Sequence, residues 1–141
     1  MRLLLLALTV AAAATAPLAL ADAAVLDISP HQLKFGKHPF GSSVFETVTL
    51  TNTGSTSVLV DIETLDVPDD FSPGQPDSTC TIPEEKLLAP GESCTHIVGW
   101  LSEAIFPGRR VAFLLVTVKD AATGEVLETH RIRMTALAVE P

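Results

Sequence analysis

Positive charge is scarce in this sequence. Lysine and arginine together number 9 against 17 aspartates and glutamates, which gives a net charge of −8 at pH 7. An acidic surface of this kind repels the phosphates of nucleic acids and the anionic head groups of lipids. We therefore expect neither nucleic-acid binding nor electrostatic docking to a membrane.

Motifs that carry chemistry are also lacking. No serine lies in a G-x-S-x-G elbow, no glycine-rich loop suits a phosphate, and no H-x-H pair or EF-hand spacing is present. The four histidines fall one to a segment, at His31, His38, His96 and His130. The sequence predicts no enzyme, no cofactor and no metal centre.

A long hydrophobic run occurs at the N-terminus. After a short basic start, residues 3–16 are almost unbroken apolar sequence, which is shorter than the roughly 20 residues that span a bilayer. Two overlapping A-x-A sites follow, so residues 1–23 are predicted to be a secretory signal peptide, cleaved after Ala21 or Ala23. An uncleaved membrane anchor is the alternative. We expect a periplasmic or secreted protein that does not insert into the membrane after cleavage.

Cysteine is limited to Cys80 and Cys94. An even pair in an exported chain predicts a disulfide, worth about 3 kcal/mol for a loop of this length in the chain-entropy account. A metal pair and a redox couple are the alternatives, and the lack of a C-x-x-C motif and of a nearby histidine pair disfavours both. The bridge would differ from that of antibody domains, because Trp100 follows both cysteines instead of lying between them.

From residue 25 onward, apolar residues recur with a period of two, and no segment holds a helical period for three turns. Strands are predicted at residues 25–28 and 32–35, 43–52, 57–65, 93–101, 110–119 and 125–139. Gly54 is expected to take a positive φ in a hairpin turn. The stretch 67–83, rich in proline and aspartate, is predicted to be a long loop with Phe71 as its apolar plug. The sequence thus predicts an all-β, immunoglobulin-like antiparallel β-sandwich of about seven strands, as a single domain over residues 24–141.

Four motifs occur in one ordered series, at residues 26–30 (LDISP), 33–36 (LKFG), 48–54 (VTLTNTG) and 88–95 (LAPGESCT). The series resembles the bacterial branch of the abnormal-spindle/hydin (ASH) family of Ig-like domains. These domains are also met as choice-of-anchor D modules, and they belong to the wider major-sperm-protein-like (MSP-like) sandwich group. The resemblance implies a structural or protein-interaction role, here in the cell envelope.

The strand that begins near Cys94 departs from the family pattern. His96 takes an inward position that is usually apolar, Trp100 fills the aromatic slot, and Ser102 replaces a proline. An inward polar side chain needs a hydrogen-bond partner, so a partner for His96 is expected.

Because the sequence shows no catalytic or metal-binding motif, we looked for residues that could form a contact surface for a partner. The turn over residues 105–110 places two large apolar side chains beside an arginine pair, and the candidate partner-contact residues are Ile105, Phe106, Arg109 and Arg110. Phenylalanine and arginine are favoured at interface centres, and a loop tucked onto the core with solvated arginines is the alternative. Exposed edge strands offer a second route to a partner.

We expect an exported, non-catalytic module that contacts proteins. A periplasmic chaperone of β-sandwich type and a metal-binding sandwich are the alternatives.

Overall fold

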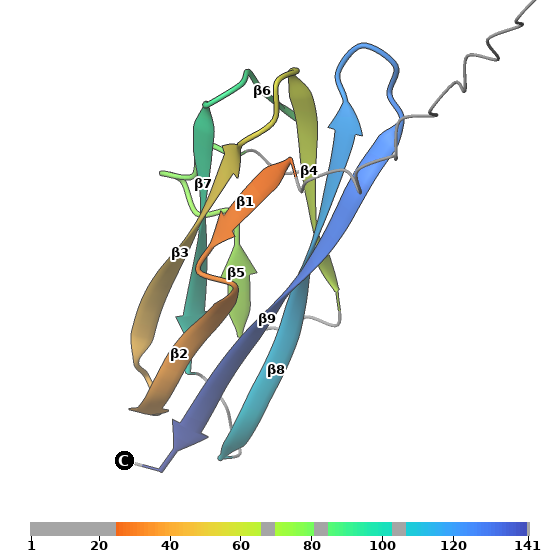
Figure 1. Ribbon diagram of the computed structural model, residues 1–141. Helices are drawn as coiled ribbons and strands as arrows, with labels where there is room; N and C mark the ends of the chain where they lie inside the picture. Colours follow the sequence, from red (N-terminus) through yellow and green to blue (C-terminus); the bar gives the residue numbers. More distant parts are fainter. Residues whose placement is uncertain (1–24, 66–69, 81–84, 103–106, 141) are drawn as a thin grey trace, which may run out of the picture.

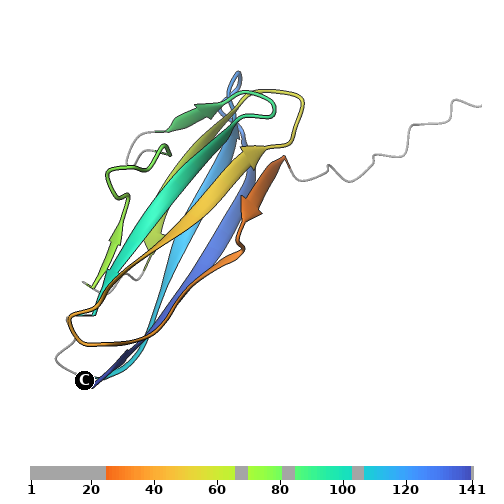
Figure 2. The same ribbon diagram turned by 90° about the vertical axis from the view of Figure 1, so that its left-hand side faces the viewer.

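The computed structural model describes residues 25–65, 70–80, 85–102 and 107–140. Within these residues the chain forms nine strands and no helix, arranged as two sheets packed face to face (Figure 1, Figure 2). Sheet A comprises, in spatial order, β1 (Leu26–Ser29), β3 (Ser43–Asn52), β7 (Ser93–Leu101) and β5 (Phe71–Pro73). Sheet B comprises β2 (Gln32–Pro39), β9 (Val126–Val139), β8 (Gly108–Asp120), β4 (Val58–Leu65) and β6 (Lys86–Leu88). The predicted all-β sandwich is confirmed.

Two strands, β5 and β6, add to those that alternation predicts. Each is three residues long, and a period of two is not visible in so short a segment. β5 lies within the predicted loop of residues 67–83, at the edge of sheet A, where Pro73 is tolerated. Phe71 is buried, as expected of an apolar plug. No helix in the described part of the chain is long and apolar enough to cross a membrane.

β1 and β2 are consecutive in the chain but belong to different sheets, because the chain crosses one flank of the sandwich between them (Figure 1). β1 pairs antiparallel with β3, whereas β2 runs parallel to β9. β2 is consequently the last strand of sheet B on this flank. This position makes β2 an edge strand with one face toward solvent.

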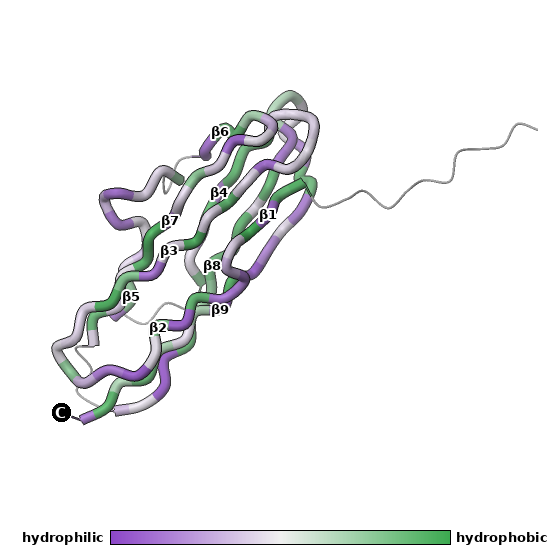
Figure 3. Tube along the Cα trace, turned by 60° about the vertical axis from the view of Figure 1, so that its left-hand side comes forward, coloured by the Kyte–Doolittle hydropathy of each residue, from purple (hydrophilic) through white to green (hydrophobic). Residues whose placement is uncertain are grey.

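The inward side chains of both sheets form one core. Figure 3 shows hydrophobic and hydrophilic residues alternating along the strands, which is the pattern of a sheet buried on one face. At the end of the core near β5, the ring of Phe35 lies 5.5 Å from that of Phe71 and 6.4 Å from that of Trp100. Burying a phenylalanine side chain contributes roughly 1.5–3 kcal/mol, so this aromatic cluster anchors β2, β5 and β7 together.

Asn52 and Gly54 stabilise the turn between β3 and β4, but not in the way that the sequence predicts. Gly54 does not take a positive φ; its N–H donates to Oδ1 of Asn52 at 2.9 Å. A Cβ at this position would lie 3.2 Å from Cγ1 of Val25, so glycine is needed for space. The fully buried Asn52 side chain also donates to the carbonyls of Thr56 and Leu88. This asparagine therefore joins the β3–β4 turn to the end of β6.

Candidate functional site

The predicted contact residues separate in the structure. Ile105 and Phe106 lie outside the described residues, while Arg109 and Arg110 open strand β8. Because neighbouring residues of a strand point to opposite faces, the two arginines face different surroundings. Arg109 is exposed on the outer face of sheet B, and Arg110 is partly buried.

Arg110 is held by an acidic residue at the end of the sandwich. Its Nε lies 3.3 Å from Oδ2 of Asp70, and the same oxygen accepts a hydrogen bond from Nε1 of Trp100 at 3.0 Å. The Asp70 side chain is only 10% exposed. This carboxylate links the start of β8 to the end of β7, so Arg110 has a structural role in this arrangement.

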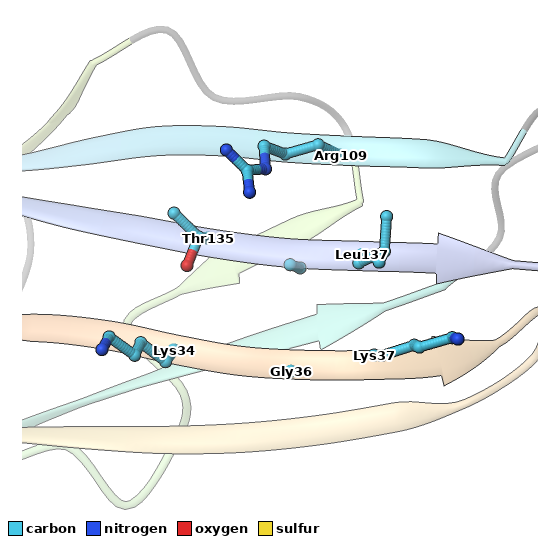
Figure 4. A pocket seen from close by; sticks show the side chains of 7 residues that line it. Lys34, Gly36, Lys37, Arg109, Thr135 and Leu137 are labelled. Atoms are coloured by element: carbon cyan, nitrogen blue, oxygen red, sulfur yellow. The ribbon is translucent and has the colours of Figure 1, made fainter.

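Arg109 instead lines a hollow of about 310 Å³ on the outer face of sheet B (Figure 4). Strand β2 contributes Lys34 and Lys37 to its wall, and β9 contributes Thr135 and Leu137. Lys37 and Arg109 lie on either side of Leu137 in one row across the three strands, and Lys34 lies beside Thr135. We call this feature the basic groove; it brings three cationic side chains around one depression.

A β-bulge in β2 explains why two lysines only three positions apart line the same face. The register of β2 against β9 shifts between Lys34 and Gly36, and Gly36 takes a φ of +80°. Gly36 then pairs with the buried Ala136, which returns Lys37 to the outer face. Without the extra residue, strict alternation would turn Lys37 toward the core.

The basic groove continues into a wider cationic surface. Five of the chain's nine lysines and arginines lie exposed on the outer face of β2, β9 and β8 in the described part of the protein: Lys34, Lys37, Arg109, Arg131 and Arg133. The guanidinium of Arg131 lies 4.6 Å from the ring centre of Phe113 on β8. In a chain of net charge −8, this concentration of cations on one face marks a surface suited to an anionic group.

Alternation along β9 would have been enough to predict that Arg131 and Arg133 share a face. The proximity of Lys34, Lys37 and Arg109 depends instead on the parallel pairing of β2 with β9 and on the bulge. Neither feature has a local signal strong enough to read from one sequence. These residues were therefore missed by sequence reasoning, apart from Arg109.

Cys80 and Cys94 form the predicted disulfide, with their Cα atoms 5.2 Å apart. The N–H groups of Thr79 and Cys80 both donate to the carbonyl of Thr95, at 2.8 and 2.9 Å. The bridge thus fastens the segment after β5 to the start of β7. Both cysteines are buried, which makes the bridge a structural staple at this end of sheet A.

His96 is fully buried, as its inward position predicts. Neither ring nitrogen makes a hydrogen bond of standard geometry among the described residues, and the backbone of Cys80 is close enough to the ring to act as a weak partner. Burial lowers the pKa of His96 below its usual 6.5, and the backbone of Cys80 opposes this by a smaller amount. The ring is therefore held in its neutral form within the core.

His38 and His130 make local contacts. Nε2 of His38 lies 2.8 Å from the carbonyl oxygen of Phe35, and Nε2 of His130 lies 3.3 Å from Oε1 of Glu128. Among the residues that the structure describes, no three or more His, Cys, Asp or Glu side chains are grouped as metal ligands would be. The basic groove is consequently the feature of this surface with the clearest chemistry.

Solved structures share the fold of this chain, whereas comparisons at the level of sequence find no relative. No model of a protein family matches the sequence, and no curated protein matches it. An ASH / PapD-like domain of human CEP192 (PapD-like domain 7) superposes with a TM-score of 0.68 at 15% identity, over 89% of this chain and 93% of that one.

Two further structures are similar. SSP-19, an MSP-domain protein like family member in Caenorhabditis elegans, gives a TM-score of 0.56 at 16% identity, over 77% of this chain and 96% of that one. The periplasmic chaperone SfaE gives 0.59 at 13% identity, over 82% of this chain and 60% of that one. The resemblance to the ASH and MSP-like sandwich group is thus confirmed at the level of the fold.

Proposed function

We propose that this chain is an exported, non-catalytic module of the cell envelope that binds a protein partner through the basic groove. The observation that carries the proposal is that Lys34, Lys37 and Arg109 all line one hollow in an acidic domain. Arginine presents a planar fork that matches a carboxylate, and charge-assisted hydrogen bonds are about twice as strong as neutral ones. An acidic side chain of a partner protein fits this groove.

Contact through side chains is favoured over the addition of a partner strand to β2. The edge of β2 carries Lys34, Lys37, a bulge at Gly36 and a terminal Pro39. Lysines, bulges and prolines are the features that keep sheet edges from pairing with another chain. We therefore expect β2 to contact a partner through its lysine side chains, and not by pairing its backbone with a partner strand.

Export is supported by the N-terminal leader-like sequence over residues 1–23 and by the buried disulfide, which belongs in an oxidising compartment. Mass spectrometry of the protein recovered from the envelope or the medium tests this part. A chain that begins at Asp22 or Ala24 is expected. A chain that retains residues 1–23 and stays in the cytoplasm would overturn it.

The alternative function is that of a periplasmic chaperone or assembly factor, and the likeness to SfaE favours it. A chaperone binds its client transiently and delivers it to an assembly. The module proposed here stays with its partner. Pulse-chase measurement of the complex separates the two, because a client would leave within the time of assembly whereas a resident partner would persist.

The groove is tested by reversing its charge. We expect the variant Lys37→Glu with Arg109→Glu to lose most of the partner that the wild-type chain retains after mild cross-linking in the native cell. The matched control is Lys86→Glu with Lys119→Glu, which changes the net charge equally: Lys86 lies on β6, the edge strand opposite β2, and Lys119 lies at the end of β8 far from Arg109. Equal retention of the partner by both double variants would exclude the groove as the contact.

A further inference from the structure

The outer face of sheet B is divided by charge about its middle strand. β8 is the third of the five strands, with β2 and β9 on one side and β4 and β6 on the other. Its outward residues form an apolar stripe that stays partly exposed, consisting of Val111, Phe113 and Leu115. A stripe of large apolar side chains along the centre of a sheet face is the kind of surface that packs against another sheet.

The two sides of this stripe carry opposite charges. On the β9 side lie Arg131 and Arg133, and on the β4 side lie Asp61 and Glu63. Arg131 and Glu63 flank Leu115 in one row, each one strand from β8. Their backbones are about 10 Å apart, given a strand spacing of about 4.8 Å. No ion pair joins these two side chains within the described chain.

This arrangement is self-complementary under a two-fold rotation. An axis that runs along β8, midway between two facing sheets, exchanges the β9 side of one copy with the β4 side of the other. Arg131 of each copy then faces Glu63 of the other at the same height, while Leu115 packs on its own counterpart. A two-fold interface requires this kind of reciprocal match.

We propose that the outer face of sheet B binds a second copy of this chain, with the apolar stripe of β8 at the centre and Arg131–Glu63 pairs on both sides. The rows from Val111 to Lys119 extend over about 27 Å, and the strands that face one another across the axis are β9, β8 and β4. They cover roughly 400 Å² per copy, at a strand spacing of about 4.8 Å and a rise of about 3.4 Å per residue. The total of roughly 800 Å² is smaller than a standard interface, so the proposed dimer is a weak one.

The Arg131–Glu63 row at the centre of the dimer face lies away from the basic groove, although Val111, at the near end of the stripe, pairs with Thr135 of the groove wall. Arg109 lies six residues along β8 from Leu115, a distance of about 20 Å at about 3.4 Å per residue. The inference therefore does not depend on the proposed function. Charge reversal at Lys37 and Arg109 tests the groove, and charge reversal at Arg131 and Glu63 tests the dimer face.

Sedimentation equilibrium of the oxidised, leader-free protein at physiological salt tests the dimer. We expect the wild-type chain to dimerise weakly, with a dissociation constant on the order of 100 μM, as suits an interface of this size. Arg131→Glu and Glu63→Arg should each weaken the dimer about tenfold or more, because each change places like charges opposite one another. The combined variant should return to within about threefold of wild type, because it restores the pair with its charges exchanged. Glu125→Arg, a reversal in the exposed β8–β9 turn, is the control and should leave the dimer unchanged.

A wild-type chain that stays monomeric at about 200 μM would overturn the proposal, since a dimer of the expected affinity would hold more than half of the chains at that concentration. Dimerisation that neither single variant weakens would also overturn it. So would single variants that weaken the dimer while the combined variant fails to recover. Circular dichroism of each variant verifies that the sandwich remains folded.

Discussion

His96 has surroundings that are unusual for a histidine. It lies fully buried on β7, and neither ring nitrogen makes a hydrogen bond of standard geometry among the described residues. Such a group costs free energy in the folded state, on the order of 1–3 kcal/mol for a buried polar atom without a hydrogen bond. The inward direction of His96 follows from alternation alone. The lack of a standard hydrogen bond does not, because it depends on which side chains of the facing sheet lie nearby.

Burial of His96 predicts that the protein loses stability in mild acid. Desolvation keeps the pKa of the folded ring below 6.5, so below that pH the unfolded chain binds more protons than the folded one. The free energy of unfolding should therefore decrease as the pH falls from 6.5 toward 5. Urea unfolding at a series of pH values measures this, and the slope should be much smaller in His96→Leu.

The matched control is His31→Asn, at an exposed position, which should keep the wild-type slope. Carboxylates titrate mainly below about pH 4.5, so the window between pH 6.5 and 5 isolates the histidines. An unchanged slope in His96→Leu would show that this buried ring does not set the acid response.

At the scale of the elements, alternation located the long strands well. β3 and β7 occupy exactly the predicted residues 43–52 and 93–101. Short strands and irregular pairing could not be predicted in this way. The bulge in β2 is decisive for the site, because it turns Lys37 outward to join Arg109. A single glycine in a strand indicates a bulge only weakly. The basic groove could therefore not be predicted from the sequence and became visible only in the structure.

The bulge makes a prediction about Gly36. A Cβ there would meet nothing closer than Nε2 of His38 at 3.5 Å, so space is adequate and the φ of +80° is the obstacle. Gly36→Ala should destabilise the protein by about 1–2 kcal/mol, the strain of a left-handed residue. Gly36→Asn should lose less, because asparagine tolerates this conformation. Chemical unfolding measures both, and equal losses in the two variants would contradict the account.

At the scale of the whole molecule, the family resemblance and the fold agree. The ordered motifs at residues 26–30, 33–36, 48–54 and 88–95 predicted an ASH-type sandwich, and structures of the ASH and MSP-like group superpose on the chain. The motifs are architectural, as the buried hydrogen bonds of Asn52 show. They fix the shape of the module. The contact surfaces that we propose include residues outside these motifs, such as Arg131 and Glu63, so the resemblance alone could not locate them.

The disulfide should stabilise the domain without being required for its fold. Cys80 and Cys94 are 14 residues apart, and closing a loop of this length contributes about 3 kcal/mol in the chain-entropy account. Cys80→Ala with Cys94→Ala should lower the free energy of unfolding by about that amount, as measured by urea unfolding. The control is wild-type protein under reducing conditions, which should show a similar loss. An unchanged free energy in both would contradict the role of the bridge as a staple.

The proposal that the basic groove is the contact for a protein partner is tested most directly by site-specific photo-cross-linking in the native cell. A photoreactive residue replaces Lys37 in one strain and Lys86 in another, two lysines on opposite edge strands of sheet B. We expect a defined cross-linked protein from position 37, absent from position 86 and lost when Arg109→Glu is added. The same adduct from both positions, or an adduct from position 37 that survives Arg109→Glu, would contradict the proposal.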